Sequence, residues 1–341
     1  MDFRLIAPGA TLLAVLGCAP RSNGSHDSEP TDIRARFLAD SLRPVHFIGD
    51  SLTFGQVTGL VVDDSGDVYV LDALNGTIRG FTSDWHAADS VGHRGKGPGE
   101  FGHASRLMLN EDRSLLVLDQ SNLRLSEYSA DGGRVTWQRD MPLPFPANDA
   151  CVLGRSVVLM GLYDDATLHE LTDSGVVARS FAPPPEGATV PAFAGAGFVR
   201  CDATSGIVIE VPGTMATVRA FRGSGEMIWQ HQLTGYHPIV YEIGSGGTVT
   251  PKFDSTGMAH SAVAAFFLDD STLVVQLEVA RRGRAPGSGQ EVDTRLLDIR
   301  TGQARGATGE LPKLMYVHDT LAFAALADPY PRIQVLTLRS E

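Results

Sequence analysis

Apolar and polar residues alternate in short runs along this chain, and the runs recur as a unit. Residues 57–81 read VTGLVVDDSGDVYVLDALNGTIRGF, and residues 104–128 read ASRLMLNEDRSLLVLDQSNLRLSEY. Each copy is an apolar stretch, a turn that contains Asp, an alternating run that ends in Leu-Asp, a polar turn and a second alternating run. A period of two is typical of half-buried strands, so each copy predicts three antiparallel strands in a meander.

The middle strand of this unit recurs six times, with spacings of 47, 42, 50, 66 and 48 residues. The six copies are Val68-Tyr69-Val70, Leu115-Leu116-Val117, Val157-Val158-Leu159, Ile207-Val208-Ile209, Leu273-Val274-Val275 and Leu321-Ala322-Phe323. A period near 45 residues with four strands per unit is typical of a β-propeller. We therefore expect an all-β, six-bladed β-propeller over residues 42–341. An extra loop at 236–259 accounts for the long interval.

The two ends of the chain are predicted to close the ring. Residues 45–60 align with residues 89–107, which places Val45–Ile48 where an outermost fourth strand belongs. The last unit ends at Leu338 after three strands, and an open blade would leave unpaired strand edges. Residues 45–48 are therefore expected to supply the fourth strand of the last blade.

The N-terminal segment is predicted to be a targeting signal. Leu5–Leu16 is an apolar run that is too short to span a bilayer. It ends in Val15-Leu16-Gly17-Cys18, which resembles the bacterial lipobox and implies a lipoprotein signal peptide over 1–18 with lipid on Cys18. An ordinary secretory signal or a misplaced start codon are the alternatives. Residues 19–41 are polar and predict a flexible tether. The aspartate that retains lipoproteins at the inner membrane is absent, which favours the outer membrane or the periplasmic face of the envelope.

A further resemblance rests on the sequence GHRGKGPGEFGHASRL at 92–107. It is similar to the glycine-rich GPGEF loop of the NHL-like six-bladed propeller lipoproteins of bacteria. The following Val-Leu-Asp and the YSADGG turn at 128–133 fit the NHL pattern. The resemblance covers the first two blades by motif and the others by period only. It implies the fold and an envelope location, but no particular reaction.

The glycine-rich loop itself allows two interpretations. Gly95, Gly97 and Gly99 would offer backbone amides to a phosphate. Because no helix follows and no nucleotide-binding pattern is matched, a tight connection between blades is favoured, with Phe101 packed between them and Glu100 bonded to backbone.

Polar residues before the innermost strands are the candidate site. Counted from the middle strands, Gln56, His103, Asp149 and His260 fall in similar places and would line one mouth of the central channel. The side chains of His103, His260 and Asp149 are of the types that bind zinc, and calcium is the alternative ion for this site. A hydrogen-bonded polar rim without any cofactor is the favoured alternative, since blades two and five lie across the ring from each other.

Other polar residues have simpler explanations. Turn formation is expected of the acids that precede Gly or Ser or that end a middle strand, namely Asp63, Asp64, Asp72, Asp119, Asp202, Asp269 and Asp270. Cys151 and Cys201 occupy equivalent positions in adjacent blades, so they are either a disulfide or two buried free cysteines. The loop 280–293 carries Arg281, Arg282 and Arg284, and is either a solvated surface or a contact for an anionic partner.

The net charge of the chain limits the partners it can bind. There are 28 basic and 40 acidic residues, a net charge of −12, which disfavours nucleic acid as a partner. We expect a monomeric, lipid-anchored binding module that meets an envelope protein, peptide or glycan. The alternative is a metal-dependent hydrolase or lyase that acts at the central channel.

Overall fold

The computed structural model describes residues 42–186, 191–244, 248–282, 291–308 and 311–338. The predicted signal peptide (1–18), its Cys18 and the tether 19–41 lie outside these residues, as does Arg284. Among the described residues, no helix is long and apolar enough to cross a membrane. The only regular helix among them is the short α2 (Pro191–Ala194).

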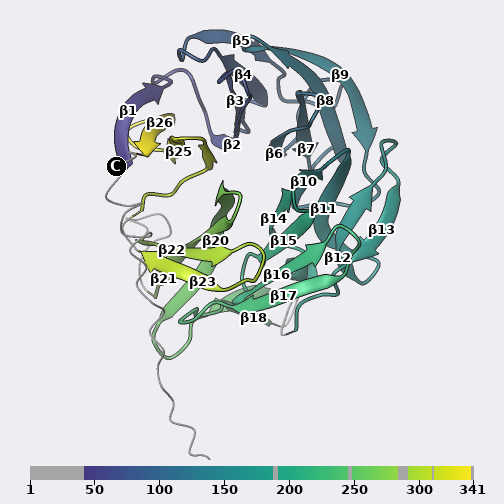
Figure 1. Cartoon of the computed structure of the whole chain (residues 1–341), viewed down its shortest axis with the longest axis vertical. Coiled ribbons are helices and arrows are strands. Elements are labelled where there is room, and N and C mark those ends of the chain that lie inside the picture. The colour runs from purple at the N-terminus through teal and green to yellow at the C-terminus, as the bar shows by residue number, and fades with distance from the viewer. Residues whose placement is uncertain (1–41, 187–190, 245–247, 283–290, 309–310, 339–341) are drawn as a thin grey trace, which may run out of the picture.

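The described strands form six four-stranded antiparallel blades around a central axis (Figure 1). From the innermost strand outward, the first blade is β2 (Val57–Val62), β3 (Val68–Asp72), β4 (Thr77–Phe81) and β5 (Ala87–Val91). The second is β6 (Ala104–Leu109), β7 (Ser114–Asp119), β8 (Arg124–Asp131) and β9 (Arg134–Pro142), and the third is β10 (Asp149–Leu153), β11 (Ser156–Tyr163), β12 (Ala166–Leu171) and β13 (Val177–Phe181).

The fourth blade is β14 (Gly197–Asp202), β15 (Ile207–Pro212), β16 (Thr217–Arg222) and β17 (Met227–Gln232). The fifth is β20 (Met258–Asp269), β21 (Thr272–Arg281), β22 (Glu291–Asp298) and β23 (Ala304–Thr308). The sixth is β24 (Tyr316–His318), β25 (Leu321–Leu326), β26 (Arg332–Leu338) and β1 (Leu42–Ile48). The chain is thus an all-β, six-bladed β-propeller, and each of the six predicted middle strands is the second strand of its blade.

The ring closes as the sequence predicts. Strand β1 pairs antiparallel with β26, with Leu42 opposite Leu338 and Ile48 opposite Ile333. In Figure 1 the two ends of the colour scale lie side by side at this point. The closing strand is longer than the predicted Val45–Ile48, because pairing starts at Leu42 and continues through a register shift between Pro44 and His46.

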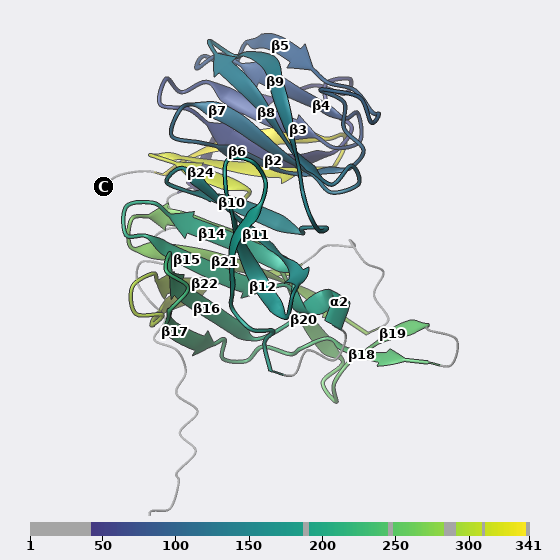
Figure 2. The same ribbon diagram turned by 90° about the vertical axis from the view of Figure 1, so that its right-hand side faces the viewer.

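The insertion between the fourth and fifth blades contains a small hairpin. Strands β18 (Val240–Ile243) and β19 (Val249–Lys252) pair only with each other. Figure 2 shows the hairpin projecting from one face of the ring. This segment makes the predicted long interval, and Pro238, just before the hairpin, forms an isolated parallel bridge with His260 of the fifth blade.

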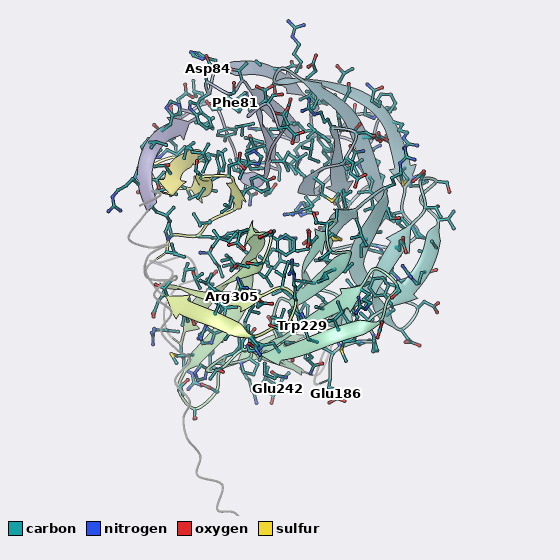
Figure 3. All side chains as sticks on the ribbon, in the orientation of Figure 1. Phe81, Asp84, Glu186, Trp229, Glu242 and Arg305 are labelled. Atoms are coloured by element: carbon teal, nitrogen blue, oxygen red, sulfur yellow. A yellow bond between two sulfur atoms is a disulfide. The ribbon has the colours of Figure 1, made fainter. Side chains whose placement is uncertain are left out.

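The hydrophobic core lies between neighbouring blades. The middle strands are buried on both faces, and Val68, Tyr69 and Val70 are all fully buried. Side chains fill the space from blade to blade (Figure 3). The labelled Trp229 of β17, for example, donates a hydrogen bond of 3.0 Å to the carbonyl of Ile299 in the next blade. Such packing makes each blade a support for its neighbours.

The GPGEF loop is a connection between blades, as favoured from the sequence. Phe101 is buried against Tyr128, with ring centroids 5.9 Å apart. The Glu100 carboxylate accepts a hydrogen bond of 2.8 Å from the Gly97 amide, and a Cβ on Gly95 would collide with that carboxylate. The glycines therefore serve close packing of the loop on Glu100.

The predicted turn acids mostly bond backbone amides. Asp63, Asp202 and Asp269 each accept from the amide two residues on, at 2.8–3.1 Å. Asp64 instead pairs with Arg113 of the next blade at 3.0 Å.

Asp72 and Asp119 do more than form their own turns. Asp72 accepts from the amides of Gly55 and Gln56, and Asp119 accepts from those of Gly102 and His103. Each of the two carboxylates therefore holds the loop that enters the innermost strand of its blade.

Candidate functional site: the central channel

The innermost strands of all six blades surround a channel with two adjoining cavities. One, of about 370 Å³, lies where the innermost strands begin, and its wall includes Gln56, Phe198 and Leu314. The other, of about 270 Å³, lies toward the ends of these strands, and its wall includes Val61, Phe267 and Val317. Arg106, Arg200, Ala265 and Met315 line both cavities. The two cavities are therefore sections of one channel.

Three charged side chains from consecutive blades meet beside this channel: Arg106 of β6, Asp149 of β10 and Arg200 of β14. The Asp149 carboxylate accepts a hydrogen bond of 2.6 Å from Arg200 Nη1 and one of 3.0 Å from the Val199 amide. Its other oxygen lies 3.4 Å from Arg106 Nε. One carboxylate thus faces two guanidinium groups, and the cluster carries a net charge of +1.

Arg200 is held tightly in this cluster. Besides Asp149, it donates to the carbonyls of Ala265 (2.5 Å) and Val199 (2.6 Å), and only 8% of its side chain is exposed. Burial lowers the pKa of Arg200 to about 10, helped by the neighbouring charge of Arg106 and opposed by Asp149. Arg200 therefore stays charged at neutral pH, and its hydrogen bonds fix the position of Asp149.

Arg106 is held more loosely. Its Nε has no hydrogen-bond partner, and among the described residues its terminal nitrogens make no hydrogen bond either. About a quarter of the side chain (26%) remains exposed, toward the channel that it lines. The terminal N–H groups of Arg106 are thus available to a ligand in the channel.

The predicted channel-mouth set is assembled only in part. Gln56 lines the first cavity, and Asp149 lies in the charged cluster behind the wall. His103 is exposed in the loop before β6 and lines neither of these cavities, and neither does His260. The expectation that all four converge at one mouth is corrected by these positions.

His260 instead contacts the insertion. Its Nδ1 accepts a hydrogen bond of 2.9 Å from the His237 amide, and the two imidazole rings stack with centroids 5.3 Å apart. The His237 ring pairs with Asp254 at 2.5 Å. Burial lowers the pKa of His260, which favours the neutral ring. The polar surroundings of His260 are therefore supplied by residues 237 and 254 and not by His103 or Asp149.

The predicted metal ligands do not form a set. Among the described residues, no three His, Cys, Asp or Glu side chains form a group that could hold a metal ion. The reason is visible for each of the three: Asp149 is bonded to arginine, His260 to the insertion, and His103 lies in an exposed loop. His103, His260 and Asp149 therefore serve separate local structures.

The channel wall also contains a covalent link between blades. Cys151 of β10 and Cys201 of β14 form a disulfide with an S–S distance of 2.07 Å and a Cα–Cα distance of 5.6 Å. Both lie opposite the central residue of a middle strand, Val158 and Val208 respectively. The first of the two sequence alternatives is thus the one found, and it ties together the blades that carry Asp149 and Arg200.

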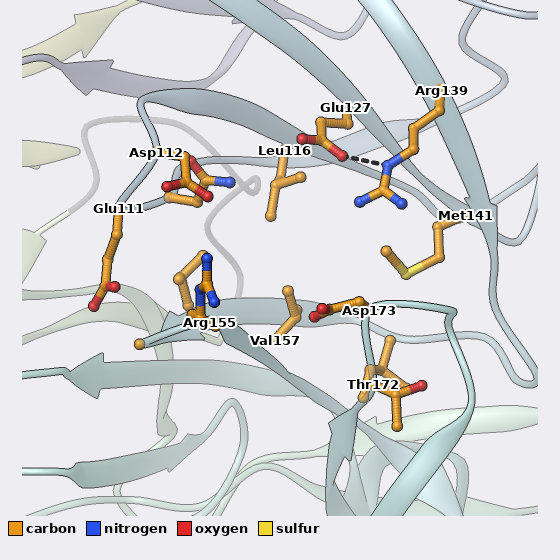
Figure 4. Close-up of a pocket in the computed structure, with 14 residues that line it drawn as sticks. Glu111, Asp112, Leu116, Glu127, Arg139, Met141, Arg155, Val157, Thr172 and Asp173 are labelled. Atoms are coloured by element: carbon orange, nitrogen blue, oxygen red, sulfur yellow. Dashed lines mark hydrogen bonds and ion pairs between the residues drawn. The ribbon is translucent and has the colours of Figure 1, made fainter.

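A further cavity lies away from the axis, between the second and third blades (Figure 4). It measures about 200 Å³ and has an apolar floor that includes Leu116 and Val157. Glu127 and Arg139 are paired at its rim at 2.6 Å, and Arg155 lies across from them. The groove is lined by both acidic and basic side chains, whereas the charged side chains of the described channel wall are basic.

The predicted basic loop is partly described. Arg281 pairs with Glu291 at 2.8 Å, and Arg282 lies within 3.4 Å of the Phe253 carbonyl. Glu291 thus offsets the charge of Arg281, which weakens the expected basic patch as a site for an anion.

Sequence reasoning missed Arg106 and Arg200, although a signal was present. Each interrupts an innermost strand that is otherwise largely apolar, in ASRLML and GFVRCD. A charge in a strand that lines a narrow channel needs a partner or a ligand. The prediction rests instead on polar residues at the starts of the innermost strands, His103 before β6 and His260 near the start of β20.

The comparisons with known proteins agree on the fold. The model of the DUF5128 family, described as a 6-bladed beta-propeller, matches residues 38–158. No curated protein matches the sequence. Similar solved structures include a member of the duf4221 family from Bacteroides vulgatus, with a TM-score of 0.58 and 10% identity over 88% of this chain and 98% of that chain.

Two further structures are similar at the same level. A Bacteroides fragilis protein taken to be exported has a TM-score of 0.53 and 12% identity, over 89% of this chain and 96% of that one. A catalytically inactive virginiamycin B lyase from Staphylococcus aureus, solved with quinupristin, has a TM-score of 0.51 and 11% identity, over 87% and 100%. Such low identities show shared architecture alone. By sequence, strand order and structural similarity, this chain is a six-bladed β-propeller.

Proposed function

We propose that this chain is a ligand-binding module of the bacterial cell envelope and that its ligand enters the central channel. The observation that supports the proposal is Arg106, whose terminal nitrogens make no hydrogen bond among the described residues and which lines both cavities of the channel, of about 370 and 270 Å³. Concave sites with apolar walls and a few directed polar groups are where small ligands bind. Either a free small molecule or one end of a peptide or glycan would fit this arrangement.

Binding is favoured over proton-transfer catalysis by the channel's chemistry. General acid–base catalysis needs a group that titrates near the working pH. The charged residues in the described wall are Arg106, Arg200 and Lys313, and neither cavity is lined by a described carboxylate or imidazole. Such a wall is better suited to holding an anionic ligand than to exchanging protons with it.

The location is part of the same proposal. The lipobox-like sequence at Val15–Cys18 supports lipid attachment at Cys18, and an exported neighbour in the same fold is consistent with export. An oxidising compartment would also allow the Cys151–Cys201 disulfide to persist. Attachment through a polar tether would leave the propeller free to meet ligands of the envelope.

The test is to block the channel. Ser105 lines the first cavity, so Ser105→Trp would fill it, whereas Gln138→Trp adds the same side chain on exposed β9. The detergent-solubilised full-length proteins are incubated with peptide and glycan fractions of the envelope, and retained compounds are identified by mass spectrometry. We expect compounds that wild type and Gln138→Trp retain and Ser105→Trp loses. Equal retention by all three, or none by any, contradicts the proposal.

A further inference from the structure

The charge of the channel wall is opposite to that of the chain. The chain has a net charge of −12, yet the charged residues in the described wall of both cavities are Arg106, Arg200 and Lys313, all basic. The acid nearest to them, Asp149, lies behind the wall with 6% of its side chain exposed. A narrow passage with walls of low dielectric strengthens such a field. The channel therefore attracts anions although the whole molecule repels them.

The surplus positive charge can be assigned to one residue. Asp149 and Arg200 satisfy each other, and Arg200 is further bonded to two carbonyls. Arg106 reaches the same carboxylate only with Nε, at 3.4 Å and without a hydrogen bond. Its two terminal nitrogens stay available, and together they form the planar edge that binds a carboxylate or phosphate through two parallel hydrogen bonds.

The net charge at Arg106 favours one of these anions. The first cavity is lined by apolar side chains, among them Leu60, Phe198, Ala264, Leu314 and Met315, and by the polar Gln56, Thr58 and Ser105. The cluster of two arginines and one aspartate has a surplus of +1, which a single carboxylate neutralises and a dianionic phosphate exceeds. Lys313 is exposed, so water screens most of its contribution.

From these observations we propose that the channel is a carboxylate-binding site. The ligand is a molecule with one carboxylate on an apolar body, and the carboxylate is bound by the terminal nitrogens of Arg106. The apolar body lies against Phe198, Leu314 and Met315. This deepens the proposed function, on which it rests, by naming the chemical class of the ligand.

The experiment uses 4-(4-fluorophenyl)butyrate and its uncharged amide as probes, with binding followed by fluorine NMR. The full-length protein is compared with Arg106→Gln and with Arg155→Gln, which removes an exposed arginine of the groove in Figure 4. We expect wild type and Arg155→Gln to bind the acid at least about tenfold more tightly than the amide, as a charge-assisted pair allows. Arg106→Gln is expected to lose this preference.

Other outcomes overturn the assignment. Equal binding of acid and amide by wild type, an unchanged preference in Arg106→Gln, or no binding of either probe would each contradict a carboxylate site at Arg106. A thermal melt of Arg106→Gln within about two degrees of wild type confirms that the variant is folded. The channel-blocking experiment separates the two proposals: if Ser105→Trp still loses envelope compounds, the binding module stands and only the carboxylate assignment fails.

Discussion

Buried charge is arranged differently in the first two blades and in the third and fourth. In the first two, Asp72 and Asp119 occupy the same place in the repeat, and both are fully buried. Each accepts hydrogen bonds from two backbone amides of the loop before the innermost strand and from a nearby asparagine. A charge that recurs with the same partners is part of what builds the blade.

In the third and fourth blades the corresponding positions are Gly161 and Val211, and buried charge lies elsewhere. Glu210 accepts a hydrogen bond of 2.7 Å from Arg219 and one of 2.6 Å from the hydroxyl of Thr167 in the neighbouring blade. Asp149 pairs with Arg200 and approaches Arg106. These charges occur once each, and they join one blade to the next.

The comparison shows that repetition alone does not separate structural from functional charge. Glu210 and Arg219 are not repeated, yet their hydrogen bonds are satisfied within the protein. Arg106 is neither repeated nor satisfied, and it lines the channel. A partly buried charge is a candidate ligand site when some of its N–H groups have no hydrogen-bond acceptor within the protein.

The largest loss of stability is expected from breaking the unrepeated, satisfied pair. Glu210→Gln leaves Arg219 charged and buried without its counter-ion, which should lower the free energy of unfolding by about 3–5 kcal/mol. Urea denaturation at pH 7 measures it. The double variant Glu210→Met/Arg219→Met removes both charges and should recover most of the loss. A single variant as stable as wild type would show that the pair is not a structural link.

The disulfide is the second link between these blades. It joins residues 50 positions apart, so replacing both Cys151 and Cys201 with Ala should lower the free energy of unfolding by about 2–4 kcal/mol. The same urea titration serves, with wild type under reducing conditions as the matched control. If the reduced wild type is as stable as the oxidised protein, the disulfide contributes nothing to holding the channel wall.

A smaller loss of stability is expected when a repeated carboxylate, that of Asp119, is removed. Asp119→Ala removes a fully buried carboxylate and leaves the amides of Gly102 and His103 without that acceptor, which should cost about 2–3 kcal/mol. The matched control is Asp64→Ala, which removes an exposed acid paired with Arg113 and should leave the urea midpoint unchanged. Equal effects of the two variants would contradict the structural role of the repeated carboxylate.

The smallest expected effect is a pH dependence of the free energy of unfolding, which originates in His169 of the third blade. His169 is fully buried, and burial lowers the pKa of its ring below the usual 6.5. The unfolded chain therefore binds the proton more tightly than the folded chain. The stability that neutral His169 contributes is present above about pH 6.5 and is lost as the pH falls below that value.

This dependence is measured by urea denaturation between pH 7.5 and 5. His169→Gln should flatten the slope in this range, although part of it remains because burial also lowers the pKa of His260. A slope as steep in His169→Gln as in wild type would assign the effect to other groups.

Most of the fold could be predicted because local sequence patterns determine its strands and turns. The six middle strands and the closing strand follow from one repeat. The same repeat places Cys151 and Cys201 in equivalent positions of adjacent blades but leaves open whether they are bonded, which the structure shows. The turn acids follow from bonds that span two residues. Such contacts need no knowledge of the packing between blades.

The site could be predicted less well because its partners are far apart in sequence. Asp149 and Arg200 are 51 residues apart, and only the ring brings them together. His260 receives its partner, His237, from the insertion, where the repeat gives no guidance. Counting positions in the repeat correctly placed Gln56 on the channel wall. It could not show that Asp149 is neutralised by arginine and unavailable to a metal ion.

The central claim is that a repeated, satisfied charge stabilises the propeller, whereas the unsatisfied Arg106 binds ligand. The most direct test measures two quantities in two variants: the urea midpoint and the acid-over-amide binding preference, in Asp119→Ala and in Arg106→Gln. We predict that Asp119→Ala lowers the midpoint and keeps the preference, while Arg106→Gln keeps the midpoint and loses the preference. If Arg106→Gln destabilises the protein as much as Asp119→Ala and both keep the preference, Arg106 is a structural residue and the account is wrong.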